Sequence, residues 1–328
     1  MTSGAVAFIV AAVVSMAVGT KMIGLLARLK LRQTISEDAP KRHQEKQGTP
    51  TMGGLIILLG AAVGAIVVWQ SDARASAVIL LTLAFAALGF LDDYLIAVRG
   101  KSLGLKARQK LAAQFALAII FMFWIHANRA ASPAAIQSTF VHIWGEWILD
   151  LGWAYYPLAV LLIVGISNAV NLTDGLDGLA AGTTTILALT LGALVAPAAS
   201  SGLTITAWAL AGGCLGFLWY NCNPAKVFMG DTGSLALGAA MAGIAIAGRK
   251  EVLFILVAAI FIFEAVSVMI QVASFKTTGK RVFKMTPIHH HFELSGWPEQ
   301  KIVVRFWILQ GLLSLVVLAA AGMLRLWD

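Results

Sequence analysis

Aspartates occur in two patterns that suit the binding of a hard cation or a phosphate group. Asp92 and Asp93 are adjacent and follow the apolar run LAFAALGFL, where a carboxylate close to lipid is costly. Asp174 and Asp177, in NLTDGLDGLAAG, are three residues apart and share a face if the segment begins a helix. Magnesium sites commonly use one or two carboxylates together with substrate phosphates. Both patterns favour phosphate chemistry, although an aspartate pair is also typical of a solvated helix end and a single aspartate of an N-cap.

A further aspartate stands at the start of an apolar segment. Asp231 lies in GDTGS (230–234), and the residues after it open a helix whose first amides favour anions. Asp231 is therefore a candidate metal ligand, although capping of the helix would also explain it. Asn171 adds an amide that can donate and accept hydrogen bonds. Asn221 and Phe228 precede GDTGS in a loop that could face a nucleotide base.

Basic and hydroxyl side chains could contact the phosphate groups. In KRHQEKQGTPTMGG, Lys46 could neutralise a phosphate and Thr51 could hydrogen-bond one. Lys110 lies at the start of an apolar segment. For a single lysine, the general excess of positive charge on cytoplasmic loops is the simpler explanation.

Three consecutive histidines, in MTPIHHHFELSG, are unusual in so apolar a chain. Consecutive residues do not share a helix face, so His289, His290 and His291 fit a zinc site poorly. Imidazoles on a loop suit phosphate contact or proton transfer near neutral pH. A solvated loop is the alternative.

Glu264 lies inside a long apolar segment, where a carboxylate is a functional candidate by default. Gln271 follows two turns later on a similar face. Hydrogen bonding between helices explains both residues equally well.

The elements that must position these residues are membrane helices. The chain has 328 residues, of which 59% are hydrophobic and only 12% are charged, too few charges for a water-facing surface. In such a chain the net charge of +8 reflects positive cytoplasmic loops rather than nucleic-acid binding. We predict one all-α domain, residues 1–328, with ten spans: 3–26, 52–70, 76–97, 111–128, 155–171, 178–196, 203–220, 234–248, 252–275 and 302–325.

Charge places the loops on two sides of the membrane. Loops after odd-numbered spans hold most of the lysines and arginines, so the positive-inside rule puts them in the cytoplasm and both termini outside. The same loops hold nearly every unusual polar residue. We therefore expect a site at the cytoplasmic face of the membrane.

Five motifs in this order resemble those of the phospho-N-acetylmuramoyl-pentapeptide transferase family: GTPTMGG, GFLDDY, NLTDGLDGLAAG, GDTGSLALG and PIHHHFE. The resemblance runs through nearly the whole chain. NLTDGLDG and GDTGS are shared with the wider superfamily of polyprenyl-phosphate sugar-phosphate transferases, of the glycosyltransferase 4 type. GTPTMGG and PIHHHFE point to the narrower family.

The resemblance implies a Mg²⁺-dependent enzyme of peptidoglycan synthesis in the bacterial inner membrane. It would transfer phospho-MurNAc-pentapeptide from UDP-MurNAc-pentapeptide to undecaprenyl phosphate, giving lipid I and UMP. The family also suggests a homodimer.

The same resemblance implies roles for the motif residues. Asp231 would be the main Mg²⁺ ligand, and Asp92 and Asp93 would engage the lipid phosphate or the metal, with Asp92 the favoured base. His289 and His290 would support the diphosphate or the sugar. Substrate contacts are expected from Lys46, Thr51, Lys110, Asn171, Asp174, Asp177, Asn221, Phe228 and His291.

One position departs from the family pattern. A lysine often stands three residues after the second aspartate of the pair, where this chain has Ile96. Either a nearby base such as Lys101 replaces it, or the contact is dispensable.

Three alternatives remain at this stage. A sister enzyme would transfer GlcNAc-1-phosphate to the same lipid. An ion-coupled transporter would place its acidic groups near the membrane midplane, whereas these gather at one face. For the transferase, direct attack by the lipid phosphate is favoured over a phospho-aspartyl intermediate, because that phosphate, with a pKa near 6, is largely ionised already.

Overall fold

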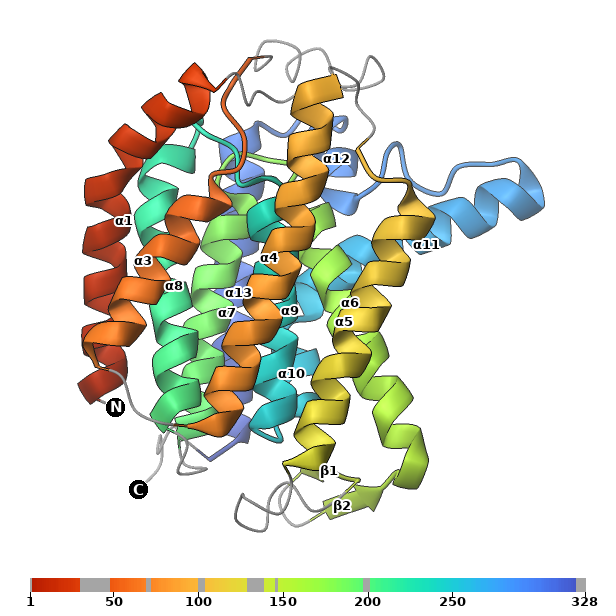
Figure 1. Ribbon diagram of the computed structural model, residues 1–328. Coiled ribbons are helices and arrows are strands. Elements are labelled where there is room, and N and C mark those ends of the chain that lie inside the picture. The colour runs from red at the N-terminus through yellow and green to blue at the C-terminus, as the bar shows by residue number, and fades with distance from the viewer. Residues whose placement is uncertain are drawn as a thin grey trace.

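The computed structural model describes residues 2–29, 48–68, 72–99, 104–128, 139–144, 147–196 and 201–322. Most of these residues form long helices that lie side by side in one bundle (Figure 1). The helices are α1 (Thr2–Arg28), α3 (Gly54–Val67), α4 (Ala73–Arg99), α5 (Ala107–Ala127), α6 (Tyr155–Thr173), α7 (Leu179–Val195), α8 (Ser201–Asn221), α9 (Gly230–Ala247), α10 (Glu251–Val257), α11 (Ala259–Thr278), α12 (Ile288–Glu293) and α13 (Glu299–Ala320).

Each of the ten predicted spans contains a helix, which confirms a mostly helical, polytopic membrane protein. Within the described ranges, eight helices are long and apolar enough to cross a membrane, whereas α3 and α7 are apolar but shorter, with 14 and 17 residues. The number of spans and the orientation of the chain therefore stay predictions.

Two local features differ from the predicted spans. The expected span 252–275 is broken at Ala258 into α10 and α11. Nε2 of Gln310 donates to the carbonyl oxygen of Val257 at 2.9 Å, which satisfies an acceptor at the break. A hairpin of β1 (Phe140–Trp144) and β2 (Trp147–Asp150), followed by the short helix η2 (Gly152–Ala154), also lies in the segment expected to be an external loop.

Helix α9 is the centre of the bundle (Figure 1). Every residue from Thr232 to Ala247 is buried. A helix that is apolar on all sides is typically enclosed by others, and its many glycines and alanines allow close approach. A Cβ on Gly89 of α4 would lie only 2.1 Å from the carbonyl oxygen of Asp231, so the two helices touch backbone to backbone there.

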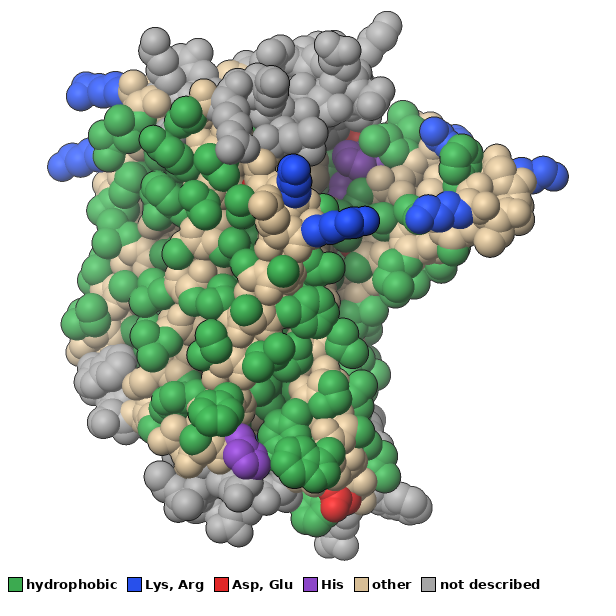
Figure 2. Space-filling view, turned by 45° about the vertical axis from the view of Figure 1, so that its right-hand side comes forward, with side chains coloured by type: hydrophobic (Ala, Val, Ile, Leu, Met, Phe, Trp, Pro, Cys, Tyr) green, Lys and Arg blue, Asp and Glu red, His purple; other side chains and the backbone are tan. Residues whose placement is uncertain are grey.

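The outer surface differs between the sides and the ends of the bundle. Hydrophobic side chains cover the sides of the bundle in Figure 2, and the visible lysines and arginines gather toward the upper end, where α12 lies. The first residues of α1 lie at the opposite end, since Gly4 packs against Thr204 and Trp208 near the start of α8. The upper end is the one predicted to face the cytoplasm.

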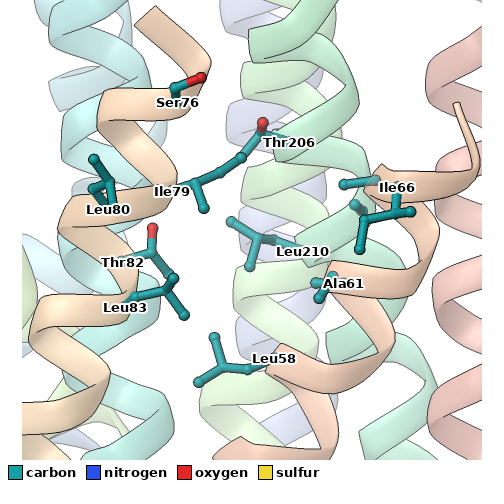
Figure 3. Close-up of a pocket in the computed structure, with 13 residues that line it drawn as sticks. Leu58, Ala61, Ile66, Ser76, Ile79, Leu80, Thr82, Leu83, Thr206 and Leu210 are labelled. Atoms are coloured by element: carbon teal, nitrogen blue, oxygen red, sulfur yellow. The ribbon is translucent and has the colours of Figure 1, made fainter. Parts of the chain in front are cut away.

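An apolar cavity of about 430 Å³ opens between α3, α4 and α8, far along these helices from the aspartate motifs (Figure 3). Leucine and alanine side chains form most of its wall. Its hydroxyl groups are engaged by their own helices: Thr82 donates to the carbonyl of Val78, and Thr206 to that of Gly202. This cavity therefore offers contact to hydrocarbon but no polar recognition.

The contact between α4 and α9 can be tested at Gly89. Gly89→Ala is expected to lower the midpoint of thermal unfolding, because the new methyl group would meet backbone atoms and overpacking typically costs about 1–3 kcal/mol. Gly165→Ala is the matched control, since Gly165 lies in α6 with nothing within 4 Å of its added Cβ. The measurement is thermal unfolding of both purified variants in one detergent. Equal midpoints would contradict the close packing.

Candidate active site

Four helices bring the predicted polar residues together at one end of α9. Asp92 and Asp93 come from α4, Lys110 from α5, Asn171 from the end of α6, and Asp231 from the first turn of α9. Both carboxylates of the pair are buried and lie within α4, which continues to Arg99, as the predicted span 76–97 implies.

Lys110 joins two of the carboxylates. Its ammonium group donates to Oδ2 of Asp231 and, at 3.3 Å, to Oδ2 of Asp92. The backbone N–H of Leu105 donates to the other oxygen of Asp92. Asn171 Nδ2 donates to Oδ1 of Asp231 at 2.7 Å. Both carboxylates are thus held by charge or hydrogen bonds, as groups removed from water must be.

Asp93 accepts hydrogen bonds from the first turn of α9. Its oxygens accept hydrogen bonds from the N–H of Asp231 at 3.1 Å and from the N–H and hydroxyl of Thr232 at 2.9 and 2.7 Å. These amides belong to the first turn of a helix and have no partner within it. Asp93 therefore acts as a cap supplied by a neighbouring helix, and it fixes the residue that carries the candidate metal ligand.

Asp174 lies at the same end and accepts no hydrogen bond from the residues that the structure describes. Burial, together with the charges of Asp231, Asp93 and Asp177, raises the pKa of Asp174 to about 7. This side chain is the least compensated carboxylate of the site. A cation or a donor group of a substrate would stabilise its charged form.

Asp177 and Asn221 connect the loops beside the site. Asp177 Oδ2 accepts from the N–H of Ala225 at 3.0 Å and from Nδ2 of Asn223 at 3.1 Å. Asn221 accepts from the N–H of Gly178 and donates to the carbonyl oxygen of Val227. Both side chains are buried and position the loop from 222 to 229. Their direct contact with a substrate stays a prediction.

The segment around Thr51 pairs with that loop. The N–H of Phe228 donates to the carbonyl oxygen of Pro50, and the N–H of Gly53 donates to the carbonyl oxygen of Phe228, both at 2.8 Å. Thr51 is buried with its hydroxyl close to Gly230. Lys46 lies outside the described residues, as does Lys101.

The histidines lie on a helix rather than the predicted loop, because residues 288–293 form α12. The rings of His289 and His290 lie close together, with centroids 4.1 Å apart, but the three side chains bond different partners. His289 is fully buried and bonds Glu264, whereas Nδ1 of His290 lies 3.0 Å from a carboxylate oxygen of Glu293. His291 accepts from the N–H of Lys284 at 3.2 Å and has no contact with the carboxylate cluster in any described interaction.

Two residues of the site were not predicted. Ser234 accepts a hydrogen bond from Asn171 at 2.9 Å, and Glu299, at the start of α13, accepts from the N–H of Asp177 at 2.7 Å. Ser234 is part of the GDTGS motif, so that motif offered a signal. Glu299 stands among ordinary charged residues before the last span, where nothing in the sequence points to Asp177.

The oxygen donors suit a hard cation. No group of three or more histidine, cysteine or acidic residues within the described part of the chain forms a ready-made metal site. Magnesium does not need one, because one or two carboxylates and substrate phosphates suffice. Asp92 and Asp231 already share one positive group, the Lys110 ammonium, which marks the place between them as suited to a cation.

Comparisons with known proteins identify the class of enzyme. Residues 75–249 match the family model described as glycosyl transferase family 4, so the chain is a membrane transferase of that class. Residues 46–58 match the first signature of the phospho-N-acetylmuramoyl-pentapeptide-transferases.

Relatives of nearly full length carry the same name. A phospho-N-acetylmuramoyl-pentapeptide-transferase of Pelotomaculum thermopropionicum is 48% identical over 98% of both chains. One of Heliobacterium modesticaldum is 48% identical over 92% of both, and one of Halalkalibacterium halodurans 46% over 90%. The chain therefore belongs to the phospho-N-acetylmuramoyl-pentapeptide transferase family. With its apolar helices, this makes it a multi-pass phosphotransferase of the bacterial inner membrane.

Lys110 gives the sharpest test of the cluster. Lys110→Met is expected to lower phosphotransferase turnover on the order of 10²-fold, as loss of one positioned charge commonly does. Arg108→Met is the control, because Arg108 is exposed on the same turn of α5. The measurement is turnover by both purified variants at equal amounts of folded protein. Similar turnover for the two would remove Lys110 from the site.

Proposed function

We propose that this chain transfers phospho-MurNAc-pentapeptide from UDP-MurNAc-pentapeptide to undecaprenyl phosphate, giving lipid I and UMP. The observation that carries the proposal is the cluster of Asp92, Lys110, Asn171 and Asp231 at one end of an apolar bundle. A water-soluble phosphate donor and a lipid phosphate can meet only at such a boundary. Membership of the family supports both substrates.

Mg²⁺ is the cofactor that this cluster fits best. Asp231 is its main ligand in the proposal, with Asp92 beside it, and phosphate oxygens complete the shell. When bound, the ion would neutralise the diphosphate and stabilise the leaving UMP.

The proposed reaction is a direct displacement. An oxygen of the lipid phosphate forms a bond to the β-phosphorus of the donor while the bond to the UMP oxygen breaks. The acceptor phosphate has a pKa near 6 and is largely ionised, so it needs little help from a base. Both oxygens of Asp92 are already engaged, one by Leu105 N–H and one by Lys110, which suits a charge-holding role more than a nucleophile. Trapping a phospho-aspartyl enzyme with donor alone would overturn this route.

In the proposal, the nucleotide end of the donor lies on the side of Asn171 that faces away from Asp231. Asp174 has a carboxylate without a hydrogen-bond partner in the described chain, and the buried Asp177 and Asn221 hold the loop that carries Phe228. His289 and His290 complete that side in the proposal. We further propose a single domain, ten spans with both termini outside, and a homodimer, as the family suggests.

The first experiment measures UMP release by the purified, lipid-supplemented protein given both substrates, with and without Mg²⁺. Metal-dependent UMP with a lipid-linked sugar is the expected result, and Asp231→Asn should lose most of it. UMP formed with UDP-GlcNAc instead would assign the sister reaction. Failure of a demonstrably folded protein to release UMP from either donor would sink the proposal.

The two adjacent aspartates should differ in their effect. Asp93→Asn turns an acceptor oxygen toward α9 into an NH2 group, so the backbone of Asp231 should shift and the half-saturating Mg²⁺ concentration should rise about tenfold, or ~1.4 kcal/mol. Asp92→Asn should lower turnover even at saturating Mg²⁺, because it also removes the charge that faces Lys110, which added Mg²⁺ does not restore. Titrating Mg²⁺ against initial rate for both variants separates the roles. If Asp93→Asn leaves the Mg²⁺ dependence unchanged, Asp93 does not position the ligand.

A further inference from the structure

A carboxylate and an imidazole face each other in the interior, between α11 and α12. Glu264 and His289 are both fully buried, with no exposed surface. Oε2 of Glu264 lies 3.0 Å from Nδ1 of His289 and 3.5 Å from its backbone nitrogen. An ionised Glu264 only accepts, so Nδ1 of His289 donates this hydrogen bond, and the bond favours the Nδ1–H tautomer and orients the imidazole.

That one bond is what orients the ring. Neither Nε2 of His289 nor Oε1 of Glu264 has a hydrogen-bond partner in the part of the chain that the structure describes. No second hydrogen bond within the described chain would hold the imidazole if the bond to Glu264 were lost. The position of His289 therefore depends on Glu264.

The far edge of the ring packs against the turn between α6 and α7. A Cβ added to Gly175 would lie 2.3 Å from Nε2 and 2.8 Å from Cε1 of His289. Only glycine leaves room for the ring there. Gly175 stands between Asp174 and Asp177, so the imidazole supports the backbone that carries both carboxylates.

We propose that Glu264 is a positioning residue for the nucleotide-sugar donor: it holds His289, and His289 holds the turn 174–178. This inference rests on the proposed function, because it assumes that the turn meets the donor. The proposed role predicts different effects on the binding of the donor and of the acceptor. Disturbing Glu264 weakens binding of the nucleotide sugar and leaves binding of the lipid phosphate, which is expected at the aspartate pair of α4, largely unaffected.

The test compares two substitutions by steady-state kinetics with both substrates varied. Glu264→Leu removes the acceptor for Nδ1–H and is expected to raise the KM for the nucleotide sugar about tenfold, or ~1.4 kcal/mol, with the KM for the lipid phosphate little changed. Glu264→Gln keeps an acceptor oxygen and should restore most of the donor affinity. Ser267→Ala is the control, since Ser267 is buried one turn away and its hydroxyl donates to the backbone carbonyl of Glu264 rather than to its carboxylate.

A second variant keeps the proposal testable if Glu264→Leu does not fold. Gly175→Ala pushes on the same ring from the opposite side, so it should also raise the donor KM selectively. Because both changes act through His289, the double variant should be little worse than the worse single variant. Additive effects would mean that the two residues act independently and would overturn the proposal.

Nitrogen-15 NMR of histidine-labelled protein without substrate reads the tautomer directly. The His289 signals, assigned with a His289→Gln variant, should show the proton on Nδ1 in the wild type and lose that preference in Glu264→Leu. An unchanged tautomer, or equal rises of both KM values, would refute the positioning role. If the wild type itself releases no UMP, the proposed function fails instead, which is a different outcome from an active wild type with unselective variants.

Discussion

The constraint on which this structure depends is the cost of removing carboxylates from water at the edge of a membrane. Five aspartates converge at the end of α9, and a buried charge is tolerated only when it is paired or hydrogen-bonded. Lys110 holds Asp92 and Asp231, the first amides of α9 hold Asp93, and loop amides hold Asp177. Asp174 accepts no hydrogen bond among the described residues, and burial together with the neighbouring carboxylates raises its pKa to about 7. The site therefore holds one carboxylate without a hydrogen-bond partner among the described residues, surrounded by carboxylates that have such partners.

Small residues make this frame possible. The site needs helix backbones closer together than side chains normally permit. Gly54 of α3 and Gly233 of α9 touch backbone to backbone, as Gly89 and Asp231 do. Gly175 admits the His289 ring in the same way. The glycines of the motifs thus set the distances between the elements, while the aspartates supply the chemistry.

Much of this could be predicted from the sequence. Hydropathy placed the helices, and the charge of the loops placed the motifs at one face, which is why Asp92, Asn171 and Asp231 were expected together. Contacts between distant segments could not be predicted. The pattern DD gives two equal carboxylates, and only the approach of α9 shows that Asp93 caps a helix while Asp92 meets Lys110. Lys110 was expected to contact phosphate, and only the approach of α5 shows that its ammonium group meets both Asp92 and Asp231.

Helix α11 shows how the polar site and the apolar membrane are joined. It is the least buried of the long helices, and its lower-numbered half holds Glu264 while its outer face exposes Phe263, Met269 and Phe275. The break at Ala258 lets it leave the direction of α10, and its far end projects from the bundle in Figure 1. One side of this helix thus faces the His289 contact and the other faces hydrocarbon. Helix α11 thus joins the polar interior to the apolar surface, because the same 20 residues carry the buried Glu264 on one side and exposed phenylalanine and methionine side chains on the other.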